Sequence, residues 1–219
     1  MRVLRALAVC GPVLFTLDWL LLGWSHAGFS PRQETISSLS SHGASWWQIM
    51  VAGQAALAVA FVAVAMLCLL ALGRRGVATA ALLGLAAVGT VQLSVFRTIC
   101  NRSDAGWCTP MPRSAYPNQQ WAHGIGTGIA FASLQLACLA CAWGTWRVVA
   151  LRDVAVVALV AEALALPAVL WFLANAETAW HGLAEKLFLT SLTVFIAYTG
   201  LRLAGYHIAT TVPGVRRTP

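Results

Sequence analysis

Apolar residues gather along this chain in six long runs, which are separated by short polar or arginine-bearing segments. A helix needs about 20 apolar residues to cross the hydrocarbon core of a bilayer, and each run is close to that length. Backbone N–H and C=O groups in hydrocarbon must find partners within their own segment, so each run is predicted to be a helix. The six predicted helices span residues 3–24, 46–72, 77–95, 121–146, 154–173 and 183–203.

The segments between the runs alternate in charge, and this alternation predicts how the helices are oriented. Basic residues close to a transmembrane helix resist translocation, so the arginine-rich segments are expected in the cytoplasm. These arginines are Arg2, Arg5, Arg74, Arg75, Arg147, Arg152, Arg202, Arg216 and Arg217. The opposite segments, 25–45, 97–120 and 174–182, are expected at the outer face, although they also carry Arg32, Arg97, Arg102 and Arg113.

The fold class that follows is all-α, a polytopic membrane bundle of six transmembrane helices over residues 1–205 with both termini cytoplasmic. Residues 206–219 are predicted to form a flexible cytoplasmic tail, because Pro213 and two terminal arginines follow the last apolar run. The first run continues through Trp24 without a small-residue cleavage site. It is therefore interpreted as an uncleaved first helix and not as a signal peptide.

Composition supports lipid as the surrounding solvent. The chain has 219 residues, of which 59% are hydrophobic and 10% charged. A soluble domain has about a quarter of its residues charged. The net charge of +7 would indicate nucleic acid only if the basic residues clustered on one footprint, and here they are spread over the breaks between runs. Nucleic acid is therefore excluded as a partner, and a membrane lipid or isoprenoid is expected.

The cysteines divide into an outer pair and an inner group. Cys100 and Cys108 flank a short outer loop, and in an oxidising compartment they are predicted to form a disulfide. Cys138 and Cys141 form a C-x-x-C motif in the fourth helix, roughly 25 Å below Trp121. That depth is too great for exchange with an outer disulfide. These two cysteines, together with Cys10 and Cys68, are expected to be small buried apolar residues.

Tryptophans mark the predicted membrane boundaries. The outer group consists of Trp24, Trp46, Trp47, Trp107, Trp121 and Trp180, and the inner group of Trp143 and Trp146. Amphipathic indole rings prefer the membrane–water interface, so an interfacial belt is the simplest interpretation. A substrate-facing role for a few tryptophans is the alternative.

Ionisable residues inside apolar helices are costly, so each is a candidate functional position. Asp18, His123, His181 and Glu185 fall at the predicted outer ends of helices, and Glu34, His42 and Asp104 lie in the outer loops. Glu162 differs, because it is near the middle of the fifth helix and close to Pro167. The gathering of these groups at one face predicts a polar site beneath the outer surface.

Structural roles for the same residues remain open. Asp18 pairing with Arg97, or Glu185 with Lys186 or His181, would simply tie helices together. Gly124 and Gly128 form a small-xxx-small pair, a pattern that favours close helix packing. A metal site made by His123, His181, Glu185 and Asp104 is chemically possible, but no tight spacing such as H-E-x-x-H supports it. No metal and no cofactor are therefore predicted.

The first outer loop carries a familiar motif, GFSPRQETISSLS at residues 28–40. It resembles the loop after the first helix in the bacterial family called domain of unknown function 998. The resemblance implies a six-helix protein of a bacterial cell membrane, and His123 matches a histidine that opens the fourth helix in that family. Phe96-Arg97 and a later Asp104 replace a Phe-Pro-x-Asp type segment. The cysteine-bearing insertion, and Ser40 where glycine is usual, are departures. The resemblance implies a fold and no activity.

Three functional hypotheses follow. The first is a membrane-embedded enzyme with terpene-cyclase-like chemistry, in which Asp18, Glu34 or Glu162 protonates an isoprenoid or lipid. The second is a non-catalytic lipid-binding, sensing or envelope assembly protein. The third is a lipid head-group hydrolase that uses His123, His181 and a carboxylate such as Glu185. The residues predicted to bind substrate are Trp19, Trp24, Trp121, Trp171 and Arg97.

Overall fold

Long helices dominate the computed structural model, which describes residues 1–100, 107–112, 114, 116–174 and 180–211. In these residues six helices have 19 residues or more. They are α1 (Arg2–Ser25), α3 (Trp47–Leu72), α4 (Val77–Val95), α5 (Gln119–Trp146), α6 (Arg152–Ala174) and α7 (His181–Thr211). The short helix α2 (Ile36–Leu39) lies in the first long loop, and two 3-10 turns, η1 (Gly73–Gly76) and η3 (Val149–Leu151), join neighbouring helices. Each predicted run corresponds to one long helix.

Five continuous helical stretches are able to cross a membrane by their length and composition. One of them, Trp47–Val95, contains both α3 and α4, because η1 joins them without a break. The chain reverses at Gly73, whose φ of +56° is a left-handed conformation that glycine adopts readily. The two helices then pack against each other.

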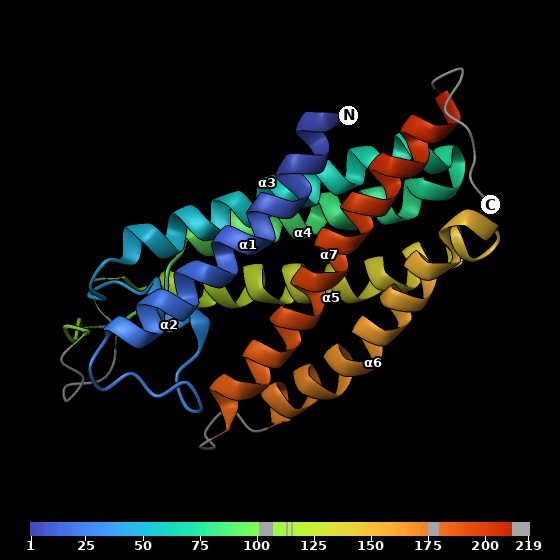
Figure 1. Ribbon diagram of the computed structural model, residues 1–219. Helices are drawn as coiled ribbons and strands as arrows, with labels where there is room; N and C mark the ends of the chain where they lie inside the picture. The colour runs from blue at the N-terminus through green and yellow to red at the C-terminus, as the bar shows by residue number, and fades with distance from the viewer. Residues whose placement is uncertain (101–106, 113, 115, 175–179, 212–219) are drawn as a thin grey trace.

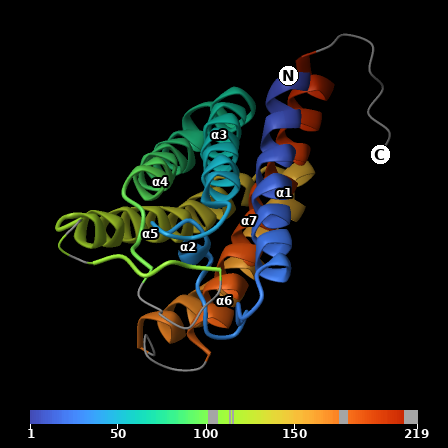
Figure 2. The ribbon, with the colours of Figure 1, turned by 90° about the vertical axis from the view of Figure 1, so that its left-hand side faces the viewer.

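The helices form a closed ring, in which each one packs against its neighbours in the order α1, α3, α4, α5, α6, α7 and back to α1. Both ends of the described chain lie at one end of this ring, together with η1 and η3 (Figure 1). We call this the terminal end. The opposite end, called the loop end, holds segments 26–46, 96–100, 107–112 and 116–118 and faces the viewer in Figure 2, where α2 lies among the ends of the long helices.

Close packing between α4 and α5 depends on one glycine pair. A Cβ built on Gly89 would lie 2.8 Å from the carbonyl oxygen of Gly126, so the two backbones approach without side chains between them. By contrast, a Cβ on Gly124 or Gly128 would meet nothing within 4 Å. The prediction that Gly124 and Gly128 provide the packing surface is therefore wrong, because α5 presents the intervening glycine to α4.

The cysteine predictions are confirmed except at one position. Cys68, Cys138 and Cys141 are buried thiols in the bundle core, whereas Cys10 is exposed on the outer surface of α1. Cys10 was expected to be buried, but α1 turns that face away from its neighbours. The last helix also continues to Thr211, so residues 206–211 of the predicted tail are helical. Residues 212–219, with Arg216 and Arg217, lie outside the described residues.

Candidate functional site

A buried glutamate of α7 holds the first long loop inside the loop end of the bundle. The Glu185 side chain is only 2% exposed. Its carboxylate accepts hydrogen bonds from the backbone N–H of Ile36 and, at 3.2 Å, from the hydroxyl of Ser37. Both donors belong to the first turn of α2, where N–H groups have no partner within the helix. Glu185 therefore satisfies these groups and fixes α2 against α7.

The neighbouring Lys186 binds the same loop from the other side. It is 5% exposed, and its Nζ donates to the backbone oxygen of Glu34 at 2.5 Å and to that of Gly182 at 3.2 Å. The rings of Phe29 and Trp19 lie 5.4 Å and 6.0 Å from the ammonium. Carbonyl oxygens and aromatic faces together compensate a buried positive charge. Lys186 is the only lysine in the chain.

A second network joins segment 42–47 to the end of α4. Arg97 Nη2 donates to His42 Nδ1 at 2.9 Å, and its guanidinium lies 3.6 Å above the Trp47 ring. The ring of Tyr116 stacks on His42 with centroids 4.1 Å apart. Burial, followed by the charge of Arg97, lowers the pKa of His42. Arg97 therefore holds His42 as an acceptor, and the alternative pairing of Arg97 with Asp18 is not found among the ion pairs of the described residues.

The remaining predicted catalytic residues contact different neighbours. His123 Nδ1 lies 2.8 Å from the backbone oxygen of Phe96, and His181 stacks on Phe172 with centroids 4.1 Å apart. The Asp18 carboxylate lies against the backbone of Gly53. These contacts connect α5 with the segment after α4, α7 with α6, and α1 with α3.

Two further predicted positions complete this account. Glu162 is buried on α6, and its Oε2 has no hydrogen-bond partner among the described residues. Asp104 lies outside the described residues, as do Arg102 and Arg113.

Glu185 also borders a small, partly open cavity of about 30 Å³ among the long helices. Ser37, Gln54, Thr90 and Thr127 supply polar groups to its wall, and the rest of the wall is apolar. A water molecule needs about 10–15 Å³ measured in this way, so the cavity has room for one or two waters. A prenyl or acyl chain does not fit in it.

A larger groove of about 670 Å³ follows the interface of α1 and α7 at the loop end. It is lined by Trp19, Leu20, Gly23, Trp24, His26, Phe29, Pro31, Leu183, Lys186, Leu187 and Thr190. A second depression of about 220 Å³ continues along the same two helices toward the terminal end, between Pro12–Leu17 and Thr193–Ala197. Together we call these the α1–α7 groove. Of the residues predicted to bind substrate, the groove brings together Trp19 and Trp24, while Trp121 and Trp171 are exposed on α5 and α6.

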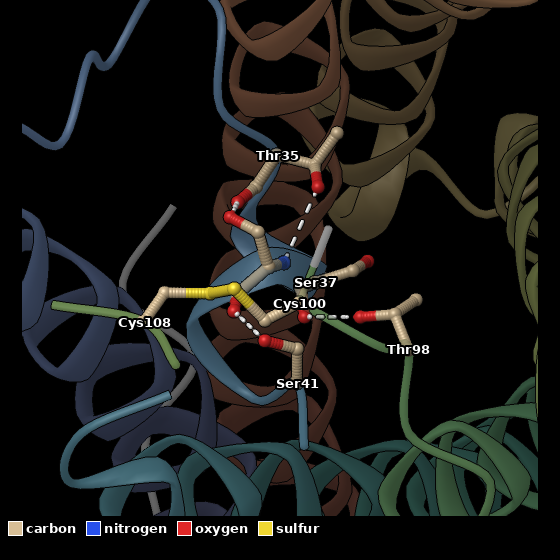
Figure 3. Close-up of a disulfide and its surroundings, with 7 residues drawn as sticks. Thr35, Ser37, Ser41, Thr98, Cys100 and Cys108 are labelled. Atoms are coloured by element: carbon tan, nitrogen blue, oxygen red, sulfur yellow. Dashed lines mark hydrogen bonds between the residues drawn. A yellow bond between two sulfur atoms is a disulfide. The ribbon is translucent and has the colours of Figure 1, made fainter. Parts of the chain in front are cut away.

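A polar pocket of about 260 Å³ lies beside the disulfide at the loop end. Cys100 and Cys108 are bonded, as predicted, with their Cα atoms 6.1 Å apart (Figure 3). The pocket wall comprises Glu34, Thr35, Ser38, Ser41, Thr98, Ile99, Cys100, Trp107, Cys108 and Gln120. The sequence placed Trp107 in an interfacial belt, but the side chain is only 4% exposed and its ring contacts those of His26 and Phe29.

Sequence reasoning did not assign the polar pocket or the role of Lys186. One sequence feature could have indicated the role of Lys186: it is the single lysine of the chain, and it follows a glutamate near the start of a helix. The pocket had only a weak signal, because serines and threonines in a loop are usually interpreted as helix caps. In the part of the chain that the structure describes, no three His, Cys, Asp or Glu side chains are grouped so that they could hold a metal ion.

The composition of its long helices makes this chain a multi-pass integral membrane protein. Its residues 9–202 match the model of the family described as Protein of unknown function (DUF998). The chain therefore belongs to the domain of unknown function 998 family, which confirms the resemblance found in the first loop. We found no curated protein and no solved structure that it matches.

Proposed function

We propose that this protein binds a membrane lipid without converting it, and that the lipid chain lies in the α1–α7 groove with its polar part beside Lys186. The groove is the observation that supports this proposal. It follows two helices for much of their length, and its walls are largely apolar with aromatic rings near the loop end. Ligand sites commonly combine an apolar cleft with a few placed polar groups.

Lys186 is suited to the polar part of such a lipid. An ammonium group has three N–H donors, and two of them bind the backbone oxygens of Glu34 and Gly182. The third can donate to an ester or phosphate oxygen of a lipid in the groove. Because Lys186 also holds the first loop, lipid binding would be coupled to the position of that loop.

Filling the groove tests the proposal. Leu20→Trp and Leu187→Trp place a large ring in the groove from α1 and from α7, and both leucines are at its surface. Leu164→Trp is the matched control, because Leu164 is 60% exposed on α6, outside the residues that line the groove. We expect native mass spectrometry after detergent extraction to show a retained lipid in the wild type and the control, and loss of it in both groove variants. Equal lipid retention in all four proteins would remove the proposal.

Acid-catalysed conversion of an isoprenoid has less support. It needs one of the predicted acids beside an apolar cavity that accepts the substrate. Asp18 and Glu162 line none of the cavities described above, and the pocket that Glu34 lines is polar. The hydrolase hypothesis is weaker for a similar reason, because His123 and His181 bind different elements. Asp18→Asn and Glu162→Gln discriminate, since a cyclase would lose turnover in these variants while a lipid-binding protein would keep its lipid.

A further inference from the structure

We propose that the terminal end carries a surface that binds the head groups of anionic phospholipids, and that Arg74, Arg75 and Arg147 form it. Arg74 and Arg75 belong to η1, between α3 and α4, and Arg147 directly follows α5. All three side chains are exposed. The surface goes beyond the proposed lipid site, because none of these residues lines the α1–α7 groove.

Helix packing brings the three arginines together. A Cβ built on Gly144, in the last turn of α5, would lie 2.9 Å from the backbone oxygen of Arg75, so the backbones of α5 and η1 meet there. Arg147 is three positions further along the chain, which corresponds to a rise of roughly 4.5 Å. The two arginines of η1 and Arg147 therefore lie within about one helical turn of the same level.

Exposed tryptophans place these arginines at the boundary of the bilayer. Trp143 and Trp146, in the last turn of α5, are 77% and 53% exposed. Indole rings prefer the interface between hydrocarbon and water, where the lipid head groups lie. The guanidinium of Arg147 lies over the Trp143 ring, 5.6 Å from its centre, so the arginine side chain runs back along α5 toward the bilayer. The charge of Arg147 is thus held near the level of the lipid phosphates.

The positive charge of this surface is not neutralised by the described residues. At the terminal end their acidic side chain is Asp153, at the start of α6, and it accepts hydrogen bonds from Tyr198 and Arg202. In the same part of the chain, the three arginines of the surface form no ion pair. Their guanidinium groups are therefore available to an anion from outside the protein.

Chain length keeps the two acidic residues outside the described part away from this surface. These are Asp104 and Glu177, and each is three positions from a described tryptophan of the loop end, Trp107 or Trp180. Three residues span at most about 11 Å. The 28 residues of α5, which connects the two ends, give it a length of about 42 Å. Residues 212–219 contain two arginines and no acid.

Neighbouring arginines at this depth are suited to a lipid phosphate with net negative charge. A guanidinium group is planar and can donate two parallel N–H bonds to the oxygens of a phosphate. Basic residues at a membrane boundary attract anionic lipids, whereas the ammonium of a zwitterionic lipid offsets the charge of its phosphate. The position beside Trp143 favours a head group that is anchored in the bilayer over a dissolved phosphate ion. An anionic phospholipid is therefore the ligand that fits.

Native mass spectrometry of the full chain tests the inference. Leu187→Trp serves as the background, because it fills the groove and leaves the terminal end unchanged. The detergent-solubilised protein is titrated with dioleoyl phosphatidylglycerol and, separately, with dioleoyl phosphatidylcholine, which has the same acyl chains. We expect phosphatidylglycerol to bind at least about 5-fold more tightly. This result does not depend on whether the groove of the wild type binds a lipid.

Two variants and one control connect the preference to the proposed surface. The Arg74→Gln, Arg75→Gln double variant and Arg147→Gln should each weaken phosphatidylglycerol binding, by roughly 5-fold for each arginine removed, and leave phosphatidylcholine binding unchanged. The matched control is Arg2→Gln, Arg5→Gln, which removes two exposed charges of α1 at the same end. Because α1 packs against α3 and α7, whereas η1 packs against α3, α4 and α5, this control should keep the preference.

Three results would overturn the inference. They are equal affinity for the two lipids, an unchanged preference in both arginine variants, and an equal loss of preference in the α1 control. The last of these would show that the charge of the whole end acts, and not one surface. Since the substituted arginines are exposed, all variants should retain the helical content of the background protein, which circular dichroism measures.

Discussion

Acid–base partners at the two ends of the bundle differ in burial, and their roles differ accordingly. At the terminal end, Asp153 of α6 binds Arg202 of α7, and the two side chains are 37% and 45% exposed. At the loop end, Glu185 and Lys186 are 2% and 5% exposed. They bind mainly the backbone of the first loop, at Ile36 and at Glu34.

This difference indicates which charges organise the fold. Solvated ion pairs contribute little to stability, since water competes for both partners. A buried charge is costly unless it has hydrogen-bond partners. Glu185 and Lys186 find these partners in the first long loop, and the loop is held in place by the same hydrogen bonds. The loop end is therefore expected to be sensitive to single substitutions and the terminal end to be tolerant of them.

The largest effect is expected from removing the buried carboxylate. Glu185→Ala leaves the buried N–H of Ile36 and the hydroxyl of Ser37 without their acceptor, and should lower the free energy of unfolding by about 3–5 kcal/mol. The matched Asp153→Ala should cost at most about 1 kcal/mol. Unfolding by SDS in mixed micelles measures both values. Equal losses of unfolding free energy in Glu185→Ala and Asp153→Ala would contradict the proposed difference between the two ends.

Opening the disulfide should have the next largest effect. Cys100 and Cys108 are eight positions apart. A loop of that length stabilises the folded chain by about 2–3 kcal/mol in the chain-entropy model. The Cys100→Ser, Cys108→Ser double variant should lose that stability, which unfolding by SDS in mixed micelles measures. Cys10→Ser, at an exposed free cysteine, is the control and should leave the free energy of unfolding unchanged.

Two glycines of α7 provide a comparison within one helix. A Cβ on Gly182, at the loop end, would collide with the backbone oxygen of Glu34, whereas a Cβ on Gly205 would meet nothing within 4 Å. Gly182→Ala should destabilise by about 1–3 kcal/mol through overpacking. Gly205→Ala should stabilise by about 0.5–1 kcal/mol, because alanine loses less entropy in a helix. Thermal unfolding of both variants checks the signs, and a stable Gly182→Ala protein would contradict the close contact.

The smallest effect concerns pH at the loop end. The pKa of His42 is lowered in the folded protein, so between that pKa and the unfolded value of about 6.5 the unfolded chain binds more protons. Stability from His42 is therefore fully present above about pH 6.5 and is lost as the pH falls toward the lower folded-state pKa. Protonation also removes the acceptor for Arg97. In the His42→Asn variant, the melting temperature should fall less steeply as the pH is lowered than in the wild type. The same dependence on pH in both proteins would exclude a contribution of His42 to stability.

Much of the fold could be predicted from the sequence, but less of the candidate site. The six helices, the disulfide and the presence of charged groups at one end follow from local composition. The partners of those groups do not. An ion pair between Arg97 and Asp18 was one alternative, whereas Arg97 binds His42. Trp107 was expected at the interface and is buried. Each partner comes from a distant segment, so the distance between partners depends on how the helices are packed.

What the sequence determined by itself is the class of protein. Hydrocarbon forces every spanning segment to be helical and apolar, so the spans and their ends can be identified without any contact. Only the tertiary structure decided how each helix is rotated about its axis. Leu164 faces outward and Ala165 is buried, and both are apolar, because lipid and protein core favour the same side chains. That rotation placed Gly126 against Gly89 and exposed Cys10, and it positioned the α1–α7 groove.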